Sequence, residues 1–140
     1  MPDTDFPDLP AKALSIRQPW VWAILNAGKR IENRPRRFHY RGLICLHASL
    51  YKPNAQDGAD FTQTLIKAVP DFKKFARQAS TMPPEMKGGI IGTAEIVDCV
   101  EQSDDPWFFG PYGLVLENVQ PVKFIPVKGA LGLFNWRKNL

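Results

Sequence analysis

The chain has 140 residues, of which 44% are hydrophobic and 11% aromatic, so it is long enough for one domain with a core and too short for two. Its net charge of +4 permits a nucleic-acid partner without requiring one. No apolar run approaches the length of a transmembrane helix, and the acidic N-terminus is unlike a secretory signal. We therefore expect a cytoplasmic protein with no membrane partner, and these patterns predict no particular oligomeric state.

Residues 1–12 contain three prolines and three aspartates among few large apolar groups. This composition predicts a flexible lead-in there and a single domain over residues 13–140. Residues 14–17 alternate apolar and polar side chains, which is typical of a half-buried strand. Pro19 fits the first position of a helix, because it lacks the N–H group that is unpaired there. The sequence thus predicts a strand that turns sharply into a helix.

The helix after Pro19 is predicted to bury one face. Its apolar side chains recur at helical spacing, and Gly28 favours the left-handed conformation that ends such a helix. The predicted buried positions are Trp20, Ala23, Ile24 and Ala27.

A second strand is predicted over residues 30–34, directly after this helix. Strand alternation places Arg30, Glu32 and Arg34 on one face, with Lys29 in the turn before them. Polar groups from both ends of the helix are then expected to meet a small ligand. The residues predicted to converge are Arg17, Lys29, Glu32 and Arg34.

The middle of the chain combines a strand with a helical segment. Residues 43–49 are rich in apolar and β-branched side chains, which predicts a well-buried strand with a polar end at His47 and Ser49. Residues 60–80 show a helical period that Pro70 interrupts. We therefore predict a helical insertion that is split or kinked at this proline.

Three further strands are predicted after the insertion. Residues 90–100 form a long one, in which Gly92 allows a bulge or a close backbone approach, and residues 112–117 and 122–125 supply two more. Five to six closely spaced strands with few helices predict an α+β fold, a small β-barrel with a helix after its first strand and a helical insertion.

The cysteines do not point to a disulfide or a metal. Cys45 and Cys99 lie in apolar, strand-like segments, so we expect buried free thiols. Together with His39 and His47 they show no spacing typical of metal ligands. The sequence predicts no metal site and no cofactor.

Several aromatic side chains are candidates for stacking on a base: Trp20, Trp107, Phe108, Phe109 and Tyr112. Core packing is the commoner fate of a residue such as Trp20. The aromatic residues at 107–109 cannot all face one core, and the glycine and proline after them indicate a loop. This loop is expected to form one wall of the ligand site.

A basic run over residues 34–37, together with Arg41, is a second candidate for contact with a ligand. Such a run suits a phosphate backbone and would make binding salt-dependent. A solvated run of charges is the alternative interpretation.

Five sequence blocks together resemble the ASCH domain family, whose name abbreviates activating signal cointegrator homology. They are Ser-Ile-Arg-Gln-Pro-Trp at 15–20, Gly-Lys-Arg-Ile-Glu-Asn-Arg at 28–34, His-Ala-Ser at 47–49, Gly-Thr-Ala at 92–94 and Gly-Ala-Leu-Gly-Leu-Phe at 129–134. The resemblance extends over nearly the whole chain. It implies a PUA-like β-barrel with a cleft between the first helix and the barrel, and a nucleic-acid or nucleoside ligand.

The resemblance implies no single reaction. Some similar proteins are reported as metal-independent ribonucleases, and others as amidohydrolases that remove the acetyl group from N4-acetylcytidine. The amidohydrolase branch has a Gly-x-Lys-x-x-Thr-x-Arg pattern after the helix, with catalytic Lys and Thr. Lys29 and Arg34 match this pattern, but Glu32 replaces the threonine. The resemblance therefore favours a ribonuclease as the enzymatic version.

Each polar candidate has a functional and a structural interpretation. Lys29 is a general base if burial and the neighbouring Arg30 and Arg34 lower its pKa, or a cation that stabilises a helix C-terminus. Glu32 is an acid/base group, or the partner of an arginine in an ion pair. His47 titrates in the range useful for proton transfer, although a histidine at the end of a buried strand is more often structural.

We expect the protein to bind single-stranded RNA or a modified nucleoside in this cleft. Two enzymatic functions are possible in this cleft: a metal-independent ribonuclease is the first, and an amidohydrolase acting on N4-acetylcytidine is the second. A non-catalytic RNA reader is the third alternative. The candidate catalytic residues are Lys29, Glu32 and Ser49. The candidate ligand-binding residues are Arg17, Trp20, Arg34, His47, Trp107 and Tyr112.

Overall fold

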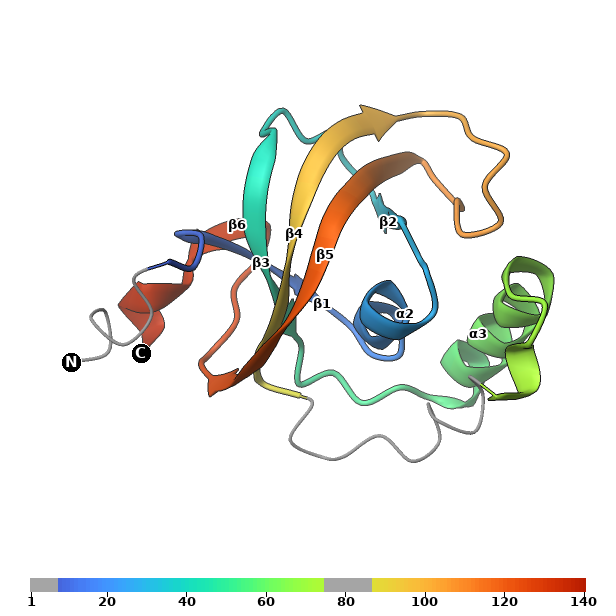
Figure 1. The fold of residues 1–140 in the computed structure, drawn as a ribbon, viewed down its shortest axis with the longest axis horizontal. Helices are drawn as coiled ribbons and strands as arrows, with labels where there is room; N and C mark the ends of the chain where they lie inside the picture. The colour runs from blue at the N-terminus through green and yellow to red at the C-terminus, as the bar shows by residue number, and fades with distance from the viewer. Residues whose placement is uncertain (1–7, 75–86) are drawn as a thin grey trace.

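The computed structural model of the protein describes residues 8–74 and 87–140, which form one six-stranded mixed sheet in the order β2-β5-β4-β3-β1-β6. The elements are β1 (Lys12–Ile16), α2 (Trp20–Asn26), β2 (Ile31–Arg34), β3 (Gly42–Ala48), α3 (Ala55–Ala68), β4 (Gly89–Val100), β5 (Tyr112–Pro126), β6 (Leu133–Asn135) and the 3-10 helix η2 (Trp136–Asn139). The long strands β3, β4 and β5 curve strongly, so the sheet forms a half-barrel around α2 (Figure 1). The predicted α+β fold, a small PUA-like barrel, is confirmed.

One strand pair in this sheet is parallel. β1 runs parallel to β3, with Ser15 opposite His47, whereas the other neighbouring strands are antiparallel. This register is set by the apolar residues that β1 and β3 bury, because a shift by one residue would turn those side chains to the other face. Two polar side chains far apart in the sequence thus become neighbours.

β5 is a single strand of 15 residues, where the sequence predicted two. The prediction of a break between residues 117 and 122 was wrong, because the strand continues through the irregular residues there by a shift in register and makes no turn. Asn118 has a positive φ of 52°, and the β4–β5 register shifts between Thr93 and Glu95 opposite this segment. Pro121, which lacks an N–H group, stands beside these irregularities, where a missing ladder bond is tolerated.

Gly92 brings the backbones of β4 and β5 close to α2, as predicted. A Cβ atom at this position would lie 2.7 Å from Leu25 Cδ2 and 2.8 Å from the Gln120 carbonyl oxygen. The β4–β5 register also shifts between Ile90 and Gly92. A side chain at residue 92 would therefore displace the Leu25 side chain and clash with the backbone of β5.

The helix α2 is buried on two sides and not along one stripe. Val21 and Ile24 belong to the cluster inside the sheet, and Trp22 and Ala23 pack in a second cluster with α3. Figure 1 shows α2 between the sheet and α3. Trp20, predicted to be a buried position of a single stripe, is only half-buried. It stands at the first residue of the helix, directly after Pro19 at the N-cap.

The helix α3 begins earlier than predicted. Asn54 caps it, since its side chain accepts a hydrogen bond from the Asp57 N–H while the Asp57 carboxylate accepts one from the Asn54 N–H. Such a capping box contributes about 1 kcal/mol to helix stability. The helix ends before Pro70, as expected for a residue that cannot continue a helix. The predicted helical segment over residues 75–80 lies outside the described residues.

A third apolar cluster packs on the side of the sheet where the chain ends. Trp136 is fully buried there, and its Nε1 donates to the Pro10 carbonyl oxygen at 2.8 Å. Cys45 is buried beside it, and both Cys45 and Cys99 are free thiols, as predicted. Burial raises the pKa of the Cys45 thiol to about 12.

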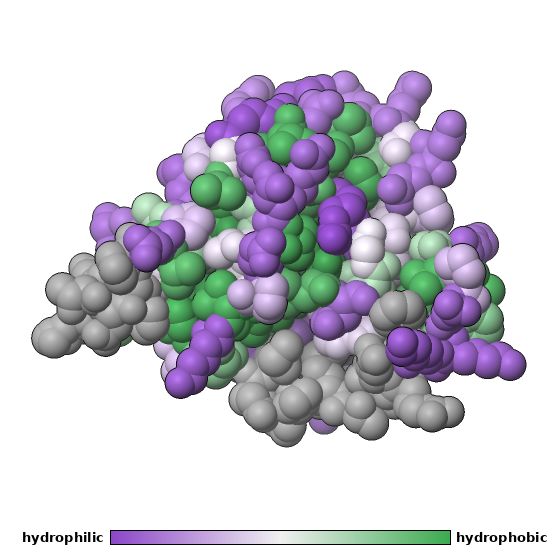
Figure 2. All heavy atoms as spheres, in the orientation of Figure 1, coloured by the Kyte–Doolittle hydropathy of each residue, from purple (hydrophilic) through white to green (hydrophobic). Residues whose placement is uncertain are grey.

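The outer surface is mixed in polarity. Figure 2 shows apolar side chains gathered over the strands of the sheet on one face, with polar side chains around them. Val119 and Phe124 of β5 are half-buried and pack against the core inside the sheet. Within the described residues, no helix has the length and apolar composition needed to span a membrane.

Candidate functional site

A cavity of about 1070 Å³, which we call the cationic cavity, opens where β1, β2 and β3 meet the start of α2 and residues 127–132. Seven of the nine residues predicted for the ligand site line it: Arg17, Trp20, Lys29, Glu32, Arg34, His47 and Ser49. The two predicted residues that do not line it are Trp107 and Tyr112.

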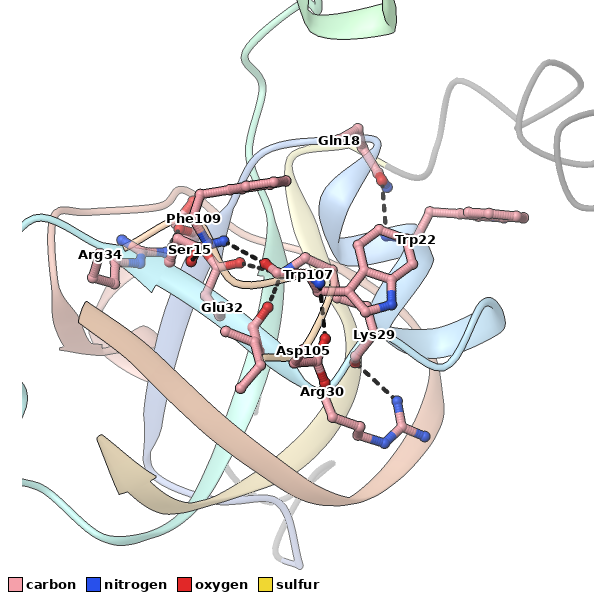
Figure 3. A network of polar contacts seen from close by, with 12 residues as sticks. Ser15, Gln18, Trp22, Lys29, Arg30, Glu32, Arg34, Asp105, Trp107 and Phe109 are labelled. Atoms are coloured by element: carbon pink, nitrogen blue, oxygen red, sulfur yellow. Dashed lines mark hydrogen bonds and ion pairs between the residues drawn. The ribbon is translucent and has the colours of Figure 1, made fainter. Parts of the chain in front are cut away.

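The lining of the cavity carries an excess of positive charge. Its cationic side chains are Arg17, Lys29, Arg34 and Lys128, and its carboxylate is Glu32. Glu32 is occupied by two of the cations, since Oε1 lies 3.1 Å from Lys29 Nζ and Oε2 lies 3.2 Å from Arg34 Nη2. Figure 3 shows Glu32 between these two residues. Arg17 and Lys128 thus leave a net positive charge that suits an anionic ligand.

Lys29 is brought to the cavity by the end of α2. Gly28 has a positive φ of 74°, and the Lys29 N–H donates to the Ala23 carbonyl oxygen across the helix end. The left-handed conformation of Gly28 was predicted from the glycine at this position. The chain then enters β2, whose alternation puts Glu32 and Arg34 on the same side, where they contact each other.

The Lys29 ammonium is almost completely buried. Its side chain is 1% exposed, and Nζ donates to the Ile31 carbonyl oxygen and to Glu32. Burial lowers the pKa of Lys29 below its ordinary value of 10.5; Arg34 lowers it further, whereas the Glu32 and Asp105 carboxylates oppose the shift. The shift has the direction that a general base needs; burial is its largest cause, and Arg34 but not Arg30 is among its causes.

Arg30 does not share this arrangement, although alternation placed it on the same face. Its Nη1 donates to the carbonyl oxygens of Ile24 and Lys29 at 2.8 and 3.0 Å. It therefore satisfies acceptors at the C-terminus of α2, where a cation is favoured by the helix dipole. The cation that stabilises the C-terminus of the helix is therefore Arg30, whereas the sequence analysis considered Lys29 for this structural role.

The aromatic loop divides between the core and the cavity. Phe109 is 56% exposed, lines the cavity and packs edge-on to Trp20, with ring centroids 5.9 Å apart. Trp107 is 3% exposed and packs with Trp22 and Phe61 in the cluster between α2 and α3. The loop forms a wall of the site, as predicted, but it does so through Phe109.

Tyr112, at the start of β5, pairs with Arg34 across the sheet but does not line the cavity. The Arg37 guanidinium stacks on its ring at 5.2 Å from the centroid. Arg37 in turn forms an ion pair with Glu101, and Arg41 lies 3.9 Å from the Asp98 carboxylate. Part of the basic run considered for phosphate contact is therefore neutralised outside the cavity.

Asn33 fixes the aromatic loop to β2. Its Nδ2 donates to the Trp107 carbonyl oxygen at 2.9 Å, and its Oδ1 accepts from the N–H groups of Phe109 and Gly110 at 2.7 and 3.0 Å. All three partners lie in the loop, so one side chain sets the position of the Phe109 ring at the cavity. Asn33 is a positioning residue that the sequence reasoning did not single out.

Exposed apolar side chains form part of the rim. Leu50, Phe109 and Leu131 line the cavity and are 76%, 56% and 99% exposed. Large apolar side chains at a concave site are typical of ligand contact surfaces. The cavity therefore combines cationic walls with an apolar rim.

The segment after β3 supplies a second aromatic surface. The Arg17 guanidinium stacks on the Tyr51 ring at 3.9 Å from the centroid, and Ser49 Oγ accepts a hydrogen bond from the Tyr51 N–H at 2.9 Å. The Tyr51 hydroxyl donates to the Asp57 carboxylate at the start of α3, which raises the pKa of Tyr51. Arg17 is thus held at the mouth of the cavity by stacking, and its charge also lowers the pKa of the nearby Asp57 carboxylate.

His47 is hydrogen-bonded at both ring nitrogens. Nδ1 lies 2.9 Å from Ser15 Oγ, and Nε2 lies 2.7 Å from the Val127 carbonyl oxygen. Burial lowers the pKa of His47 below its ordinary value of 6.5, and the hydrogen bond to Val127 opposes this shift. Ser15 was not a predicted site residue, because its partner lies 32 residues away and only the β1–β3 register brings them together.

Among the described residues, no group of three histidine, cysteine, aspartate or glutamate side chains is arranged to hold a metal ion. Lys128, which the sequence did not single out, and residues 129–132, which belong to the sequence block at 129–134, form the wall next to Ser15 and His47. Gly129 fits closely there, since a Cβ atom would lie 2.7 Å from His47 Cε1.

The family model of the ASCH domain matches residues 14–125 of this chain, which includes β1 to β5 and most residues of the cationic cavity. The chain belongs to the ASCH domain family. Its ASCH domain is 25% identical over 127 residues to activating signal cointegrator 1 from Homo sapiens. That match covers 83% of this chain but only 20% of the human protein. The chain spans about a fifth of the length of this relative, so the likeness concerns one domain.

Proposed function

We propose that this ASCH domain binds single-stranded RNA or a modified nucleoside in the cationic cavity. One observation carries the proposal. The cavity exposes Arg17 and Lys128, neither of which forms an ion pair within residues 8–74 and 87–140, beside an exposed aromatic ring, Phe109, while the carboxylate among its described lining residues is held by Lys29 and Arg34. A polymer of phosphates and bases needs both features, because cations attract the backbone and aromatic rings stack on bases.

The rim favours single strands over duplexes. Phe109 and Leu131 are exposed lining residues of a concave site, and splayed single-stranded bases, unlike paired ones, can place their faces against such side chains. Trp20 supports the Phe109 ring from below by an edge-on contact. Stacking on such a ring is sequence-tolerant and contributes about 1 to 3 kcal/mol per base.

Fluorescence anisotropy with a labelled single-stranded RNA tests this proposal. We expect Phe109→Ala to weaken binding by about 5- to 100-fold, which corresponds to the loss of one stacked base. Leu43→Ala is the matched control, because Leu43 is 53% exposed but does not line the cavity. Equal affinities of wild type and Phe109→Ala would contradict the proposed binding mode.

A metal-independent ribonuclease is the second candidate, and the position of Lys29 favours it. Cleavage of RNA without a metal requires a base that removes the 2′-hydroxyl proton and a cation that stabilises the phosphorane charge. Lys29 has a lowered pKa and lines the cavity, and the Arg34 guanidinium lies beside the same carboxylate. In this scheme Glu32 positions Lys29, and Ser49 is a hydrogen-bonding group near the mouth of the cavity.

Incubation with RNA and, separately, with N4-acetylcytidine in EDTA separates the candidates. A ribonuclease would fragment RNA, and Lys29→Met would abolish fragmentation while RNA binding persists. Release of acetate from N4-acetylcytidine would instead favour the amidohydrolase, despite Glu32 at the threonine position. Binding of RNA without RNA fragments or acetate would identify a non-catalytic reader. RNA fragments formed by the Lys29→Met variant at the wild-type rate would exclude Lys29 as the base.

A further inference from the structure

Ser15 and His47 form a hydrogen-bonded pair whose polarity can be assigned. The Val127 carbonyl oxygen can only accept, so His47 Nε2, 2.7 Å away, carries the ring proton. In the neutral ring Nδ1 is then an acceptor, and the Ser15 hydroxyl, 2.9 Å away, donates to it. This is the direction required of a nucleophile that gives its proton to a base, with the base oriented by a third group.

The surroundings hold the pair firmly against one wall of the cavity. Ser15 is half-buried and His47 is 1% exposed, and both line the cationic cavity. Gly129 covers the hydrogen bond so closely that a Cβ atom would lie 2.7 Å from His47 Cε1 and 3.1 Å from Ser15 Oγ. The ring is therefore confined, while Ser15 is half-buried and lines the cavity.

A fixed cation is bound to the backbone of Ser15. Arg34 Nη2 donates to the Ser15 carbonyl oxygen at 2.8 Å, and Arg34 lines the same cavity as Ser15. Positive charge near a nucleophile stabilises the negative charge that develops on an attacked carbonyl oxygen. A serine–histidine bridge with only a structural role needs neither access to the cavity nor such a cation.

We propose that Ser15 is the nucleophile of an acyl-transfer site, with His47 as its general base, the Val127 carbonyl as the orienting group, and an ester of the bound nucleoside or RNA as substrate. This inference rests on the proposed function, because the ligand of the same cavity carries the ester. An ester is favoured over an amide for a physical reason. A carbonyl behind the imidazole stabilises the imidazolium less than a carboxylate does, so the site suits the better leaving group.

The reaction divides into two balanced steps. Ser15 Oγ bonds to the ester carbonyl carbon as its proton moves to His47 Nδ1, and we assign Arg34, which lines the same cavity, to stabilise the resulting oxyanion. The carbon–oxygen bond to the ribose then breaks, and the leaving oxygen takes the proton from Nδ1. In the second step a water molecule gives its proton to His47 and attacks the acyl-serine, which releases the carboxylic acid and restores the Ser15 hydroxyl.

Labelling with a fluorophosphonate probe, followed by peptide mass spectrometry, tests the nucleophile directly. We expect the probe on Ser15 of the wild type and no label on the Ser15→Ala variant. Ser103→Ala should label like the wild type, since Ser103 lies outside the cavity and accepts a hydrogen bond within its own loop. No label on Ser15 in a correctly folded wild type, or a label on another serine, would overturn the inference.

The pH dependence provides a readout that a structural bridge would not give. With p-nitrophenyl acetate and with a ribonucleoside acetylated on its ribose, the rate of acyl release should rise with pH along the titration curve of His47 and become constant above it. Loss of the histidine base should slow acyl release by about 100-fold or more. A rate that only follows hydroxide concentration, equal in wild type and Ser15→Ala, would contradict the proposal.

Anisotropy of the Ser15→Ala variant separates this inference from the proposed function. RNA binding that is retained by the variant, together with label on wild-type Ser15, supports both. RNA binding without label overturns only the acyl-transfer site. Label on Ser15 in a protein that binds neither RNA nor nucleoside overturns the proposed ligand and the ester assignment while preserving the nucleophile.

Discussion

The two carboxylate oxygens of Glu32 bind different cations, one Lys29 and the other Arg34. Lys29 is 1% exposed and Glu32 10%, so this ion pair is shielded from solvent. The carboxylate thereby compensates a buried ammonium group and fixes one end of the cationic cavity.

Removal of this carboxylate should therefore be costly. We expect Glu32→Ala to lower the free energy of unfolding by about 3 kcal/mol, because it leaves the Lys29 ammonium buried without its partner. Glu101→Ala is the matched control, since it breaks an exposed ion pair with Arg37 and should cost less than about 1 kcal/mol. Urea unfolding of the two variants measures the difference, and equal losses would show that burial adds nothing to the Glu32 pair.

Asn33 is expected to act on the ligand through Phe109. Asn33→Ala removes three hydrogen bonds to the aromatic loop and should lower the free energy of unfolding by about 2 kcal/mol. It should also weaken RNA binding, although it leaves the Phe109 ring in the protein. Asn26→Ala, which removes one bond to a helix carbonyl, controls for the loss of an asparagine. Unchanged RNA affinity in Asn33→Ala would show that the ring needs no positioning.

The salt dependence of RNA binding should report on Lys128. In the proposed mode this cation meets a phosphate, so Lys128→Ala should weaken binding to all sequences similarly and reduce the slope of log Kd against log salt by about one. Arg41→Ala should leave the slope unchanged, because Arg41 lies near Asp98 outside the cavity. A slope that changes in Arg41→Ala and not in Lys128→Ala would show that RNA binds at the basic residues outside the cavity.

The stability of the protein should fall as the pH drops below 6.5. Burial lowers the pKa of His47 in the folded state, so the unfolded chain takes up this proton first and is stabilised relative to the folded one. The loss begins near the ordinary pKa of 6.5 and is complete below the folded pKa. An NMR titration measures the shift directly, with His39→Gln to assign the two histidine signals. A midpoint for His47 above 6.5 would contradict the burial argument.

Local patterns were sufficient for the parts of the site that are close in sequence. Gly28 and strand alternation predicted that Lys29, Glu32 and Arg34 meet, since a helix end and a four-residue strand have few possible geometries. The same logic misplaced Arg30, because the carbonyl groups at the end of α2 are a nearer set of acceptors. Alternation predicts a face and does not predict a hydrogen-bond partner.

Contacts across the sheet could not be predicted in this way. Ser15 meets His47 only because β1 and β3 pair in parallel in one register, and pairing is decided by the packing of the whole core. The choice between Trp107 and Phe109 also depends on α3, which provides an apolar surface for one ring and leaves the other exposed. The sequence therefore predicted that the aromatic loop reaches the cavity, but it did not predict that Phe109 is the residue of the loop that lines it.

The binding of RNA in the cationic cavity is tested most directly by NMR chemical-shift mapping of the ¹⁵N-labelled protein with a single-stranded RNA. The account predicts that the amide signals of Arg17, Lys29, Arg34 and residues 128–132 shift together on titration, while those of residues 98–101 and Arg41 stay in place. Shifts confined to residues 98–101 and Arg41, with the cavity signals unchanged, would contradict it.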